Sequence, residues 1–392
     1  MTGNRLLIVG ASVRAAAASA HRAGYRPVAI DMFGDADLLP GSTDVATAWR
    51  SADVAGAAAR FPGIPWIFCG GIEHRPALVR RLSHDRTLLG VSPALLHRVG
   101  NPLVLQEIWQ AAGLPFPTTL TEPQGLPRDG SWLAKRRRSA GGLHVRPLDH
   151  CFDTVARRGR PARAVWNYQK RIPGVSWGAA YVGNGGRAAL MGVTLQMAAP
   201  GVLTDRPFLY GGSVGPISPT TAQRESLRQL GDLAAERFEL RGLFGIDLVV
   251  DGSGQLWTVE INPRYTASME LLERADDENL IDLHVRACMH KELPTRDLIE
   301  SSRCYGKRIV YIPHSGKVTE QLSSSWLDEA LSEPWPNLAD VPRRGTHIEA
   351  GQPLITVFAS GATTNEVVET LQLRSDQIQA DFASNSVSKN CS

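Results

Sequence analysis

The chain has 392 residues, of which 43% are hydrophobic and 21% charged, and its formal net charge is +3. This length allows about two or three domains with cores of their own, and the composition is that of an ordinary globular protein. The small net charge does not indicate a nucleic-acid or membrane surface as the main partner, and no apolar run reaches the roughly 18 residues that a membrane span needs.

Residues 5–31 read as strand, glycine turn, helix and strand, a βαβ opening that ends at Asp31. The turn lacks the G-x-G-x-x-G spacing that a dinucleotide's pyrophosphate requires, so we do not expect NAD binding. A strand is predicted at 65–69, followed by helices to about residue 112. Glu73 comes just after this strand, where it either binds a substrate amine or caps a helix.

The next elements are a helix within 101–118 and a strand that ends in a basic, glycine-containing loop with the sequence WLAKRRRSAGG. The strand ends at Lys135, and Ser139, Gly141 and Gly142 follow it. Glycines allow backbone N–H groups to approach phosphate oxygens, and a lysine adds a point charge. The alternative is a basic surface hairpin, but the acidic hairpin further along the chain favours the phosphate role.

Two strands joined by an Asn-Gly-Gly turn are predicted at 176–198, and a helix at 219–240. Gln196, near the end of the second strand, faces either a cleft or solvent, and we favour solvent. The stretch 208–217 is rich in glycine but lacks the strand-to-helix Walker pattern, so it is not a P-loop.

Residues 243–264 predict two strands joined by an Asp-Gly turn. Glu260 and Asn262 are two residues apart and so project from one face, and Asp247 lies across from them on the neighbouring strand. Two carboxylates and an amide oxygen form a hard-oxygen site that suits Mg²⁺. Asp247 alone reads as a solvated rim residue, but Glu260 lies in an apolar strand, where an unpaired carboxylate is costly. Arg264 points a positive charge at the same pocket or forms a surface ion pair.

Beyond this hairpin, the sequence predicts a loop and a helix that ends near residue 292. Thr266 contacts substrate or serves as a helix cap. A strand is predicted at 307–313 and two more within 341–358, whereas the polar residues from about 383 onward are expected to be disordered.

The phrases GIDL and VEINPR resemble the closing metal-binding hairpin of the ATP-grasp superfamily. This resemblance implies that Asp247, Glu260 and Asn262 hold Mg²⁺ or Mn²⁺ on ATP. It implies that Arg264 contacts phosphate or an acyl-phosphate intermediate. It also implies that Lys135 and the loop with Ser139, Gly141 and Gly142 cover the triphosphate.

The same resemblance suggests the remaining contacts. The phrase YQKRIPG links the two halves of the nucleotide cleft and places Gln169 and Ile172 near the adenine, although family members often have Glu where this chain has Gln169 or Lys170. Many members carry a phosphate-binding basic residue just before the helix that is predicted here within 101–118, and Arg98 takes that place. The weaker substrate candidates are Glu73, Tyr210, Ser213, Arg264 and Thr266.

The implied fold class is α/β, of the α+β ATP-grasp type. A Rossmann-like preceding domain is expected at 1–100 and the ATP-grasp domain at 101–300, with a small lid at 132–200. A small β-rich C-terminal module is expected at 301–362, and a disordered tail at 383–392. The C-terminal module resembles that of biotin carboxylase-like proteins, but no lysine lies in a biotin-attachment motif.

The expected activity is that of an ATP-dependent carboxylate–amine ligase, which forms a C–N bond through an acyl phosphate and releases ADP and phosphate. The NPRYTAS phrase resembles ligases of C1-carrier cofactor assembly, such as the tyramine–glutamate ligase of methanofuran biosynthesis. The alternatives are an ATP- and bicarbonate-dependent carboxylase and a non-catalytic nucleotide-binding regulator.

We expect small-molecule carboxylate and amine substrates and neither a nucleic-acid nor a membrane partner, and we leave a homodimer open. Five scattered cysteines without CxxC spacing, together with a start that lacks a signal pattern, predict reduced thiols and a cytoplasmic location.

Overall fold

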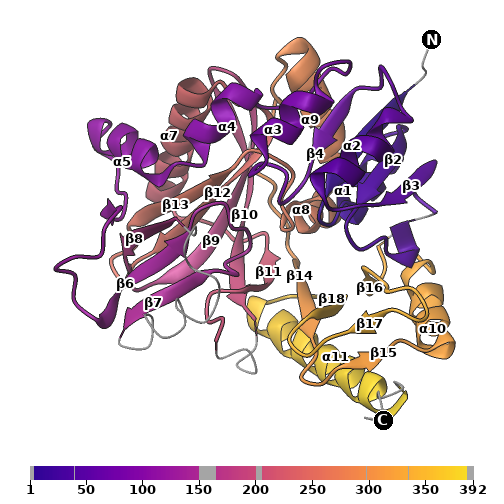
Figure 1. The fold of residues 1–392 in the computed structure, drawn as a ribbon. Coiled ribbons are helices and arrows are strands. Elements are labelled where there is room, and N and C mark those ends of the chain that lie inside the picture. The colour runs from indigo at the N-terminus through magenta and orange to yellow at the C-terminus, as the bar shows by residue number, and fades with distance from the viewer. Residues whose placement is uncertain are drawn as a thin grey trace.

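The computed structural model describes residues 4–38, 40–149, 165–199, 205–296, 298–333 and 335–385. Its elements form an N-terminal α/β unit, a small antiparallel sheet and a large central sheet (Figure 1). None of the described helices is long and apolar enough to cross a membrane. Cys69, Cys288 and Cys304 are free thiols, and Cys151 and Cys391 lie outside the described residues.

The N-terminal unit is a parallel sheet with the strand order β3-β2-β1-β4, in line with the βαβ pattern. Its strands are β1 (Arg5–Gly10), β2 (Arg26–Asp31), β3 (Asp44–Thr47) and β4 (Trp66–Phe68). Its helices are α1 (Arg14–Arg22), η1 (Ala36–Leu38), α2 (Ser51–Ala59) and α3 (Pro76–Leu82). Open parallel sheets bind ligands beyond the carboxyl ends of their strands, and here that edge carries Gly10, Asp31 and the turn that holds Glu73.

Two helices lead from this unit into a small antiparallel sheet with the order β5-β8-β6-β7. The elements are α4 (Pro93–Val99), α5 (Pro102–Ala111), β5 (Thr119–Leu120), β6 (Asp129–Arg136), β7 (Val145–Asp149) and β8 (Trp166–Lys170). This sheet ends at Lys170, so it is shorter than the lid expected at 132–200. The strands that follow belong to the central sheet, because they pair with the strands of the 241–262 hairpin.

The central sheet has eight strands in the order β13-β12-β9-β10-β11-β14-β18-β16. They are β9 (Val175–Asn184), β10 (Ala188–Ala198), β11 (Tyr210–Gly215), β12 (Arg241–Val250), β13 (Leu256–Asn262), β14 (Cys304–Tyr311), β16 (Leu338–Ala339) and β18 (Pro353–Gly361). All neighbouring strands in this sheet are antiparallel.

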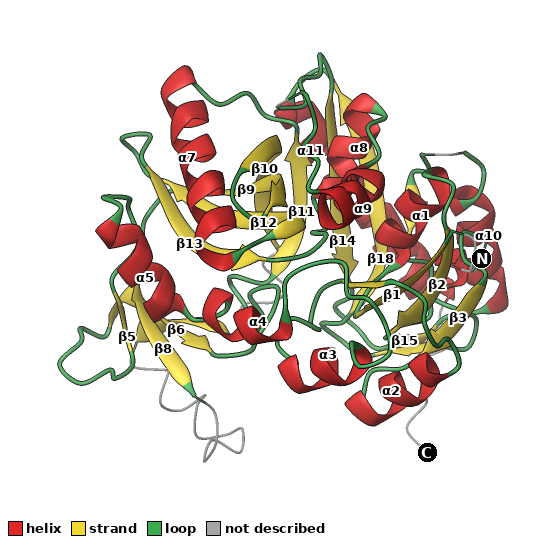
Figure 2. Ribbon diagram, turned by 90° about the horizontal axis from the view of Figure 1, so that it is seen from above, coloured by secondary structure: helices red, strands yellow, loops and turns green. Residues whose placement is uncertain are grey.

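Helices cover the central sheet on both faces (Figure 2). They are α7 (Thr221–Phe238), α8 (Met269–Asp276) and α9 (Leu280–His290). On one face, Tyr181 stacks on Phe244 at 5.1 Å between ring centroids and donates its hydroxyl to the carbonyl of Leu227 in α7. Phe244, Ile246 and Leu248 share that buried face. Since side chains alternate along a strand, Asp247 projects from the opposite face.

The C-terminal residues do not form a separate β-rich unit, because β14, β18 and β16 continue the central sheet. The remaining elements are β15 (Gly316–Lys317), α10 (Glu320–Ala330), β17 (His347–Ile348) and α11 (Thr364–Asn385). Helix α11 packs on β14 and β18 with buried residues at helical spacing, although most of its sequence is polar. The tail expected to be disordered from 383 is helical to Asn385, and 386–392 lie outside the described residues.

Candidate active site

The β12–β13 hairpin brings together two carboxylates and one amide. Asp247 lies directly opposite Glu260, and Asn262 lies opposite Gly245. The Asn262 Nδ2 atom donates to Asp247 Oδ2 at 3.0 Å and to Glu260 Oε1 at 3.3 Å. One amide nitrogen therefore reaches both carboxylates, which places all three side chains in a single cluster.

A β-bulge in β13 directs Glu260 toward the cleft. Asp247 pairs with Glu260 but Leu248 pairs with Thr258, so Val259 is the extra residue. The bulge shifts the alternation of the strand, because Thr258 is fully buried and accepts a hydrogen bond from Trp109 Nε1 at 2.9 Å, whereas Glu260 is exposed. Bulges are often found beside functional sites, where they redirect a side chain in this way.

The electrostatics of this cluster favour a bound cation. Burial, together with the charge of Glu260, raises the pKa of the Asp247 carboxyl to about 8. A divalent cation held between the two carboxylates would relieve their repulsion, and carboxylate and amide oxygens are the ligands that Mg²⁺ prefers. Asn262 turns its NH₂ toward the carboxylates and its Oδ1 toward Arg264 Nη2, at 3.1 Å, so ligation through Oδ1 would require the amide to turn over.

These donors fit a cation that also binds phosphate. Among the described residues, no group of three or more His, Cys, Asp or Glu side chains is placed to hold a metal. The hairpin supplies two carboxylates and an amide, which leaves further coordination positions for phosphate oxygens and water. Mg²⁺ typically keeps such positions for its phosphate substrate.

Lys135 faces this cluster from the small sheet. It lies next to the carboxyl end of β6, and burial lowers the pKa of its ammonium group, while Glu260 and Asp247 act in the opposite direction. Lys135 and Glu260 line the same cleft. Lysine and carboxylates on opposite walls are an arrangement suited to a polyphosphate with its cation.

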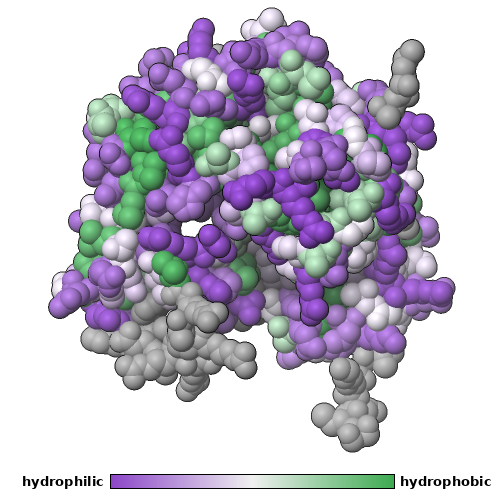
Figure 3. Space-filling model, turned by 45° about the horizontal axis from the view of Figure 1, so that its top comes forward, coloured by the Kyte–Doolittle hydropathy of each residue, from purple (hydrophilic) through white to green (hydrophobic). Residues whose placement is uncertain are grey.

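The lining of this cleft is both basic and apolar. Arg136, Arg137 and Arg138 follow Lys135 along its wall, and Arg137 Nε donates to Asn167 Oδ1 at 2.8 Å. The apolar lining comes from α4 and α5: Leu96, Val99, Pro102 and Leu105. Figure 3 shows a hollow on the face of the molecule that is turned to the viewer.

The glycine loop after Lys135 (residues 139–142), called the lid loop below, is docked onto the central sheet. The Gly141 carbonyl accepts a hydrogen bond from the Tyr210 N–H at 2.9 Å. Gly142 has a φ of +72°, and a Cβ built on it would lie 1.7 Å from the carbonyl oxygen of Phe208. Ser139 lines the cleft, and its Oγ lies 2.9 Å from His144 Nδ1. Only glycine at position 142 permits this close approach of the loop.

Arg264 is held against the N-terminal unit. Its Nε donates to Glu73 Oε1 at 2.8 Å, and both side chains are largely buried. Arg264 Nη1 donates to the Tyr265 carbonyl at 3.1 Å. Glu73 does not cap α3, since the cap position is Arg75 and shows no side-chain cap hydrogen bond. The pair therefore joins the end of the β12–β13 hairpin to the carboxyl edge of the parallel sheet.

The three other nucleotide candidates lie at different distances from the cleft. Gln169 is buried in the cleft wall, and its Nε2 donates to Thr119 Oγ1 at 3.1 Å. Ile172 is half-buried in the connection between β8 and β9 and is not part of the lining. Arg98 is exposed in the last turn of α4, next to Val99 of the lining but outside it.

Three of the weaker substrate candidates, Tyr210, Ser213 and Thr266, lie on or next to the central sheet. The Tyr210 hydroxyl and Ser213 Oγ are 2.8 Å apart. Thr266 follows Arg264, and a Cβ on Gly245 would lie 2.8 Å from its methyl group. Burial raises the pKa of Tyr210 to above its ordinary value, so its hydroxyl stays neutral.

Sequence reasoning placed Gln196 in solvent, and this was wrong. Its Nε2 donates to Asp247 Oδ1 at 2.7 Å, across the intervening strand β9. The crossing depends on Gly178, where a Cβ would lie 2.9 Å from that nitrogen. The contact joins strands that are not neighbours in the sheet, so the period-two pattern of β10 alone carries no signal for it.

Comparison with known proteins agrees with this geometry. Residues 100–268 match the family model described as the ATP-grasp domain. The protein named Uncharacterized protein MJ0776 of Methanocaldococcus jannaschii is 29% identical over 124 residues, which are 32% of this chain and 27% of that protein. The match thus spans about a quarter of the length of that curated relative.

Two solved structures share the fold over nearly the whole chain. An L-amino acid ligase from Bacillus licheniformis has a TM-score of 0.68 at 14% identity, with 96% of this chain and 97% of the other covered. The biotin carboxylase domain of the 2-oxoglutarate carboxylase of Hydrogenobacter thermophilus, in complex with MgADP, ADP and bicarbonate, has a TM-score of 0.68 at 12% identity, with 94% and 89% covered. The family match thus identifies residues 100–268 as an ATP-grasp domain, and the two solved structures share the fold over nearly the whole chain.

Proposed function

We propose that this ATP-grasp protein is an ATP-dependent ligase that activates a carboxylate as an acyl phosphate and joins it to an amine. The observation that carries the proposal is the pair Asp247 and Glu260, opposed to Lys135 across one cleft. Cationic and metal-binding groups that face each other in this way act on the phosphate end of a nucleotide.

Each group has a defined part in the reaction. Lys135 and the docked glycine loop bind the β- and γ-phosphates, and Asp247, Glu260 and Asn262 would hold Mg²⁺. The bound ion would neutralise charge on the phosphate oxygens. A carboxylate oxygen attacks the γ-phosphorus and the bond to the β-phosphate oxygen breaks, which gives ADP and the acyl phosphate. Arg264 faces the acyl phosphate while the amine attacks its carbonyl carbon, and phosphate leaves as the amine loses a proton.

The narrower assignment to a tyramine–glutamate type of ligase stays a prediction, as do the ADP-forming outcome and the C–N bond. The fold is shared with an L-amino acid ligase and with a biotin carboxylase domain, so it does not distinguish an amine from bicarbonate as the second substrate. The site residues of the proposal, which act on ATP and on the activated carboxylate, would serve either reaction.

The experiment that tests the proposal identifies the nucleotide product. The purified chain is incubated with ATP, Mg²⁺, hydroxylamine and a panel of carboxylic acids. We expect ADP, phosphate and the hydroxamate of one acid, because hydroxylamine captures an acyl phosphate. AMP and pyrophosphate as products would contradict acyl-phosphate chemistry. Phosphate release that depends on bicarbonate and not on any other carboxylate would indicate the carboxylase.

A further inference from the structure

Glu73 has one carboxylate oxygen that the protein leaves without a partner. The side chain lies in the turn between β4 and α3 and is 8% exposed. Its Oε1 accepts the hydrogen bond from Arg264 Nε, whereas Oε2 is buried and has no hydrogen-bond partner among the described residues. A buried, unpaired oxygen on an ionised group is costly. Because Glu73 lines the cleft, a bound ligand can supply the missing donor.

The chemistry of Glu73 suits binding better than proton transfer. Although burial alone would raise it, the pKa of Glu73 lies below its usual value, since the charges of Arg264 and His74 and the hydrogen bond from Arg264 favour the carboxylate. A carboxylate with a lowered pKa is a weak general base near neutral pH. Its free oxygen is therefore a permanent acceptor for a cationic donor.

Arg264, next to this Glu73 oxygen, has more N–H groups than the hydrogen bonds it makes with the described residues. A guanidinium carries five N–H groups. Three N–H groups of Arg264 donate hydrogen bonds, one each to Glu73, to Asn262 and to the Tyr265 carbonyl. The neighbouring wall is Gly70, whose added Cβ would lie 3.6 Å from Arg264 Cζ, so no side chain covers the guanidinium on that side. The pair thus presents free N–H donors and a free carboxylate oxygen next to one another.

This pair matches a ligand that carries a carboxylate and an ammonium on adjacent atoms. The net charge of the pair is zero, so a plain carboxylate at Arg264 would also face the unpaired charge of Glu73. A zwitterion faces each charge with its opposite. We propose that the activated acid is an α-amino acid, whose carboxylate lies at Arg264 and whose ammonium is bound by Glu73 Oε2. This inference rests on the proposed ligase function and names its substrate class.

The test compares amino acids with acids that differ only in the amino group. Hydroxamate formation from ATP is measured for the standard L-amino acids and for desamino counterparts such as propanoate for alanine and 3-phenylpropanoate for phenylalanine. We expect at least one amino acid to exceed its desamino counterpart by about tenfold or more in kcat/KM. Equal use of the two acids would overturn the inference while the ligase function stands.

Glu73→Gln gives a second readout. Arg264 Nε requires an acceptor, so the glutamine oxygen would face Arg264 and its NH₂ would face the substrate ammonium. We expect this variant to lower the preference for the amino acid at least tenfold, through a higher KM, and Glu73→Asp to restore part of it. Thermal unfolding of each variant shows whether the fold is intact.

Other results of these experiments would also contradict the inference. A Glu73→Gln variant with the wild-type preference would overturn the inference. The inference would also be overturned if the variant formed hydroxamate at the normal rate but reacted slowly when another amine replaced hydroxylamine. Glu73 would then bind the attacking amine. If another carboxylic acid of the panel gives hydroxamate but no acid of either set does, this inference is overturned while the ligase function stands. If no carboxylic acid gives hydroxamate or releases phosphate, the ligase proposal and this inference both fail.

Discussion

Gln196 Nε2 donates to Asp247 Oδ1 at 2.7 Å, although a whole strand separates β10 from β12 in the sheet. Asp247 therefore has an amide donor on each oxygen, Gln196 on one and Asn262 on the other. Both bonds favour the ionised carboxylate and fix the direction of its lone pairs. Outer groups of this kind orient a metal ligand and tune its affinity.

Gln196→Leu should weaken Mg²⁺ binding without unfolding the chain. Loss of a partner that orients a metal ligand typically costs about 10–100-fold in metal affinity or activity. We expect the Mg²⁺ concentration for half-maximal phosphate release to rise by about that factor. Gly178→Ala should act in the same direction, because its Cβ would displace the Gln196 amide.

A matched control is available on α11. Gln377 Nε2 donates to Asp381 Oδ1 at 2.8 Å on the exposed surface, so Gln377→Leu removes the same kind of bond away from the cleft. The Mg²⁺ requirement of that variant should be unchanged. If Gln196→Leu also leaves it unchanged, Gln196 does not orient Asp247.

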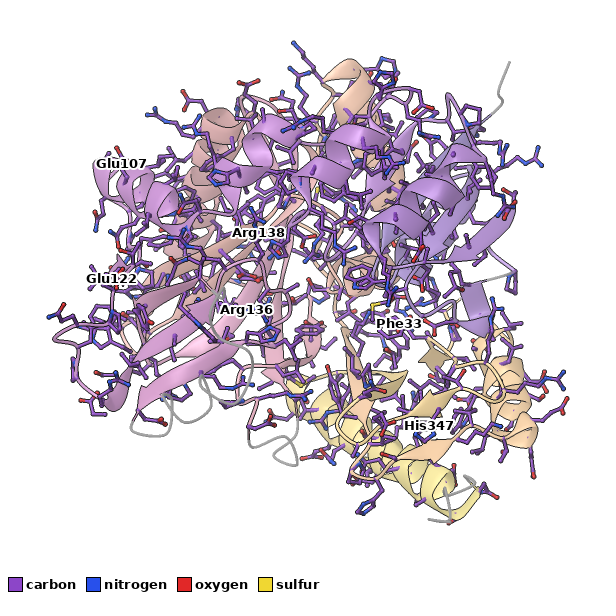
Figure 4. All side chains as sticks on the ribbon, viewed as in Figure 1. Phe33, Glu107, Glu122, Arg136, Arg138 and His347 are labelled. Atoms are coloured by element: carbon purple, nitrogen blue, oxygen red, sulfur yellow. The ribbon has the colours of Figure 1, made fainter. Side chains whose placement is uncertain are left out.

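Glu260→Gln should abolish most of the turnover while the fold is kept. The substitution removes one of two opposed carboxylates at nearly constant volume, and it also removes the charge that raises the pKa of Asp247. We expect kcat to fall at least about 100-fold at saturating Mg²⁺, which corresponds to about 2.7 kcal/mol. Glu107→Gln is the control, because Glu107 lies on the outer side of α5 (Figure 4). A normal rate for Glu260→Gln would show that the pair does not bind the metal.

The parts of the site that sequence can predict are the local ones. Turn chemistry predicts that Asp247 and Glu260 lie on the two strands of one hairpin, but a regular continuation of the register from the turn would pair Asp247 with Val259. The bulge at Val259 is not visible in that pattern, since the same alternation would put Thr258 on the face of Glu260. Tertiary packing under Trp109 determines it instead.

The parts that sequence could not predict depend on distant pairing. Glu73 and Arg264 are 191 residues apart, and only the docking of the parallel sheet on the hairpin brings them together. The lid was predicted too long because strands 175–184 and 188–198 have ordinary hairpin patterns, and nothing local states which sheet they join. Helix α11 was not predicted because most of its residues are polar, and its few buried ones give only a weak apolar pattern.

Lys135→Ala should reduce affinity for ATP but not for adenosine. The lysine faces Glu260 and Asp247, so its charge acts on the phosphates that a cation would bring to these carboxylates. Calorimetry should show an ATP Kd that rises at least about tenfold, or 1.4 kcal/mol, while the adenosine Kd changes little. Equal losses for the two ligands would mean that Lys135 supports the small sheet and does not contact phosphate.

His284 should make stability depend on pH. Its Nδ1 accepts the Leu243 N–H at 2.8 Å, its Nε2 lies 3.0 Å from the Leu89 carbonyl, and burial lowers its pKa to about 4. In the unfolded chain a histidine takes up a proton near pH 6.5, whereas the fold keeps His284 neutral. The contribution of neutral His284 to folding stability is therefore complete above pH 6.5 and is lost as the pH falls toward 4.

Denaturant unfolding of the wild type and of His284→Gln checks this. At pH 7.5 the variant should have the lower free energy of unfolding. The difference from the wild type should narrow by about 2 kcal/mol at pH 5, because pH 5 is 1.5 units below the pKa of about 6.5 in the unfolded chain. His290→Gln, in the exposed last turn of α9, should show no such narrowing. A gap that is constant with pH would show that His284 titrates normally in the fold.

The two glycines of the lid loop offer a test of docking that is independent of charge. Both have positive φ, +62° at Gly141 and +72° at Gly142, so alanine is strained by about the same amount, roughly 1 kcal/mol, at either position. They differ in their surroundings. Nothing lies within 4 Å of a Cβ on Gly141, whereas a Cβ on Gly142 would lie 1.7 Å from the Phe208 carbonyl oxygen.

Gly142→Ala should therefore keep the lid from docking, and Gly141→Ala should not. An undocked loop loses the hydrogen bond from the Tyr210 N–H to the Gly141 carbonyl and admits water to the phosphates. We expect kcat/KM for ATP to fall at least about tenfold more in Gly142→Ala than in Gly141→Ala, with protease cleavage of the loop faster in the former. Equal effects would mean that backbone strain alone is responsible, and that the contact with Phe208 does not hold the lid closed during turnover.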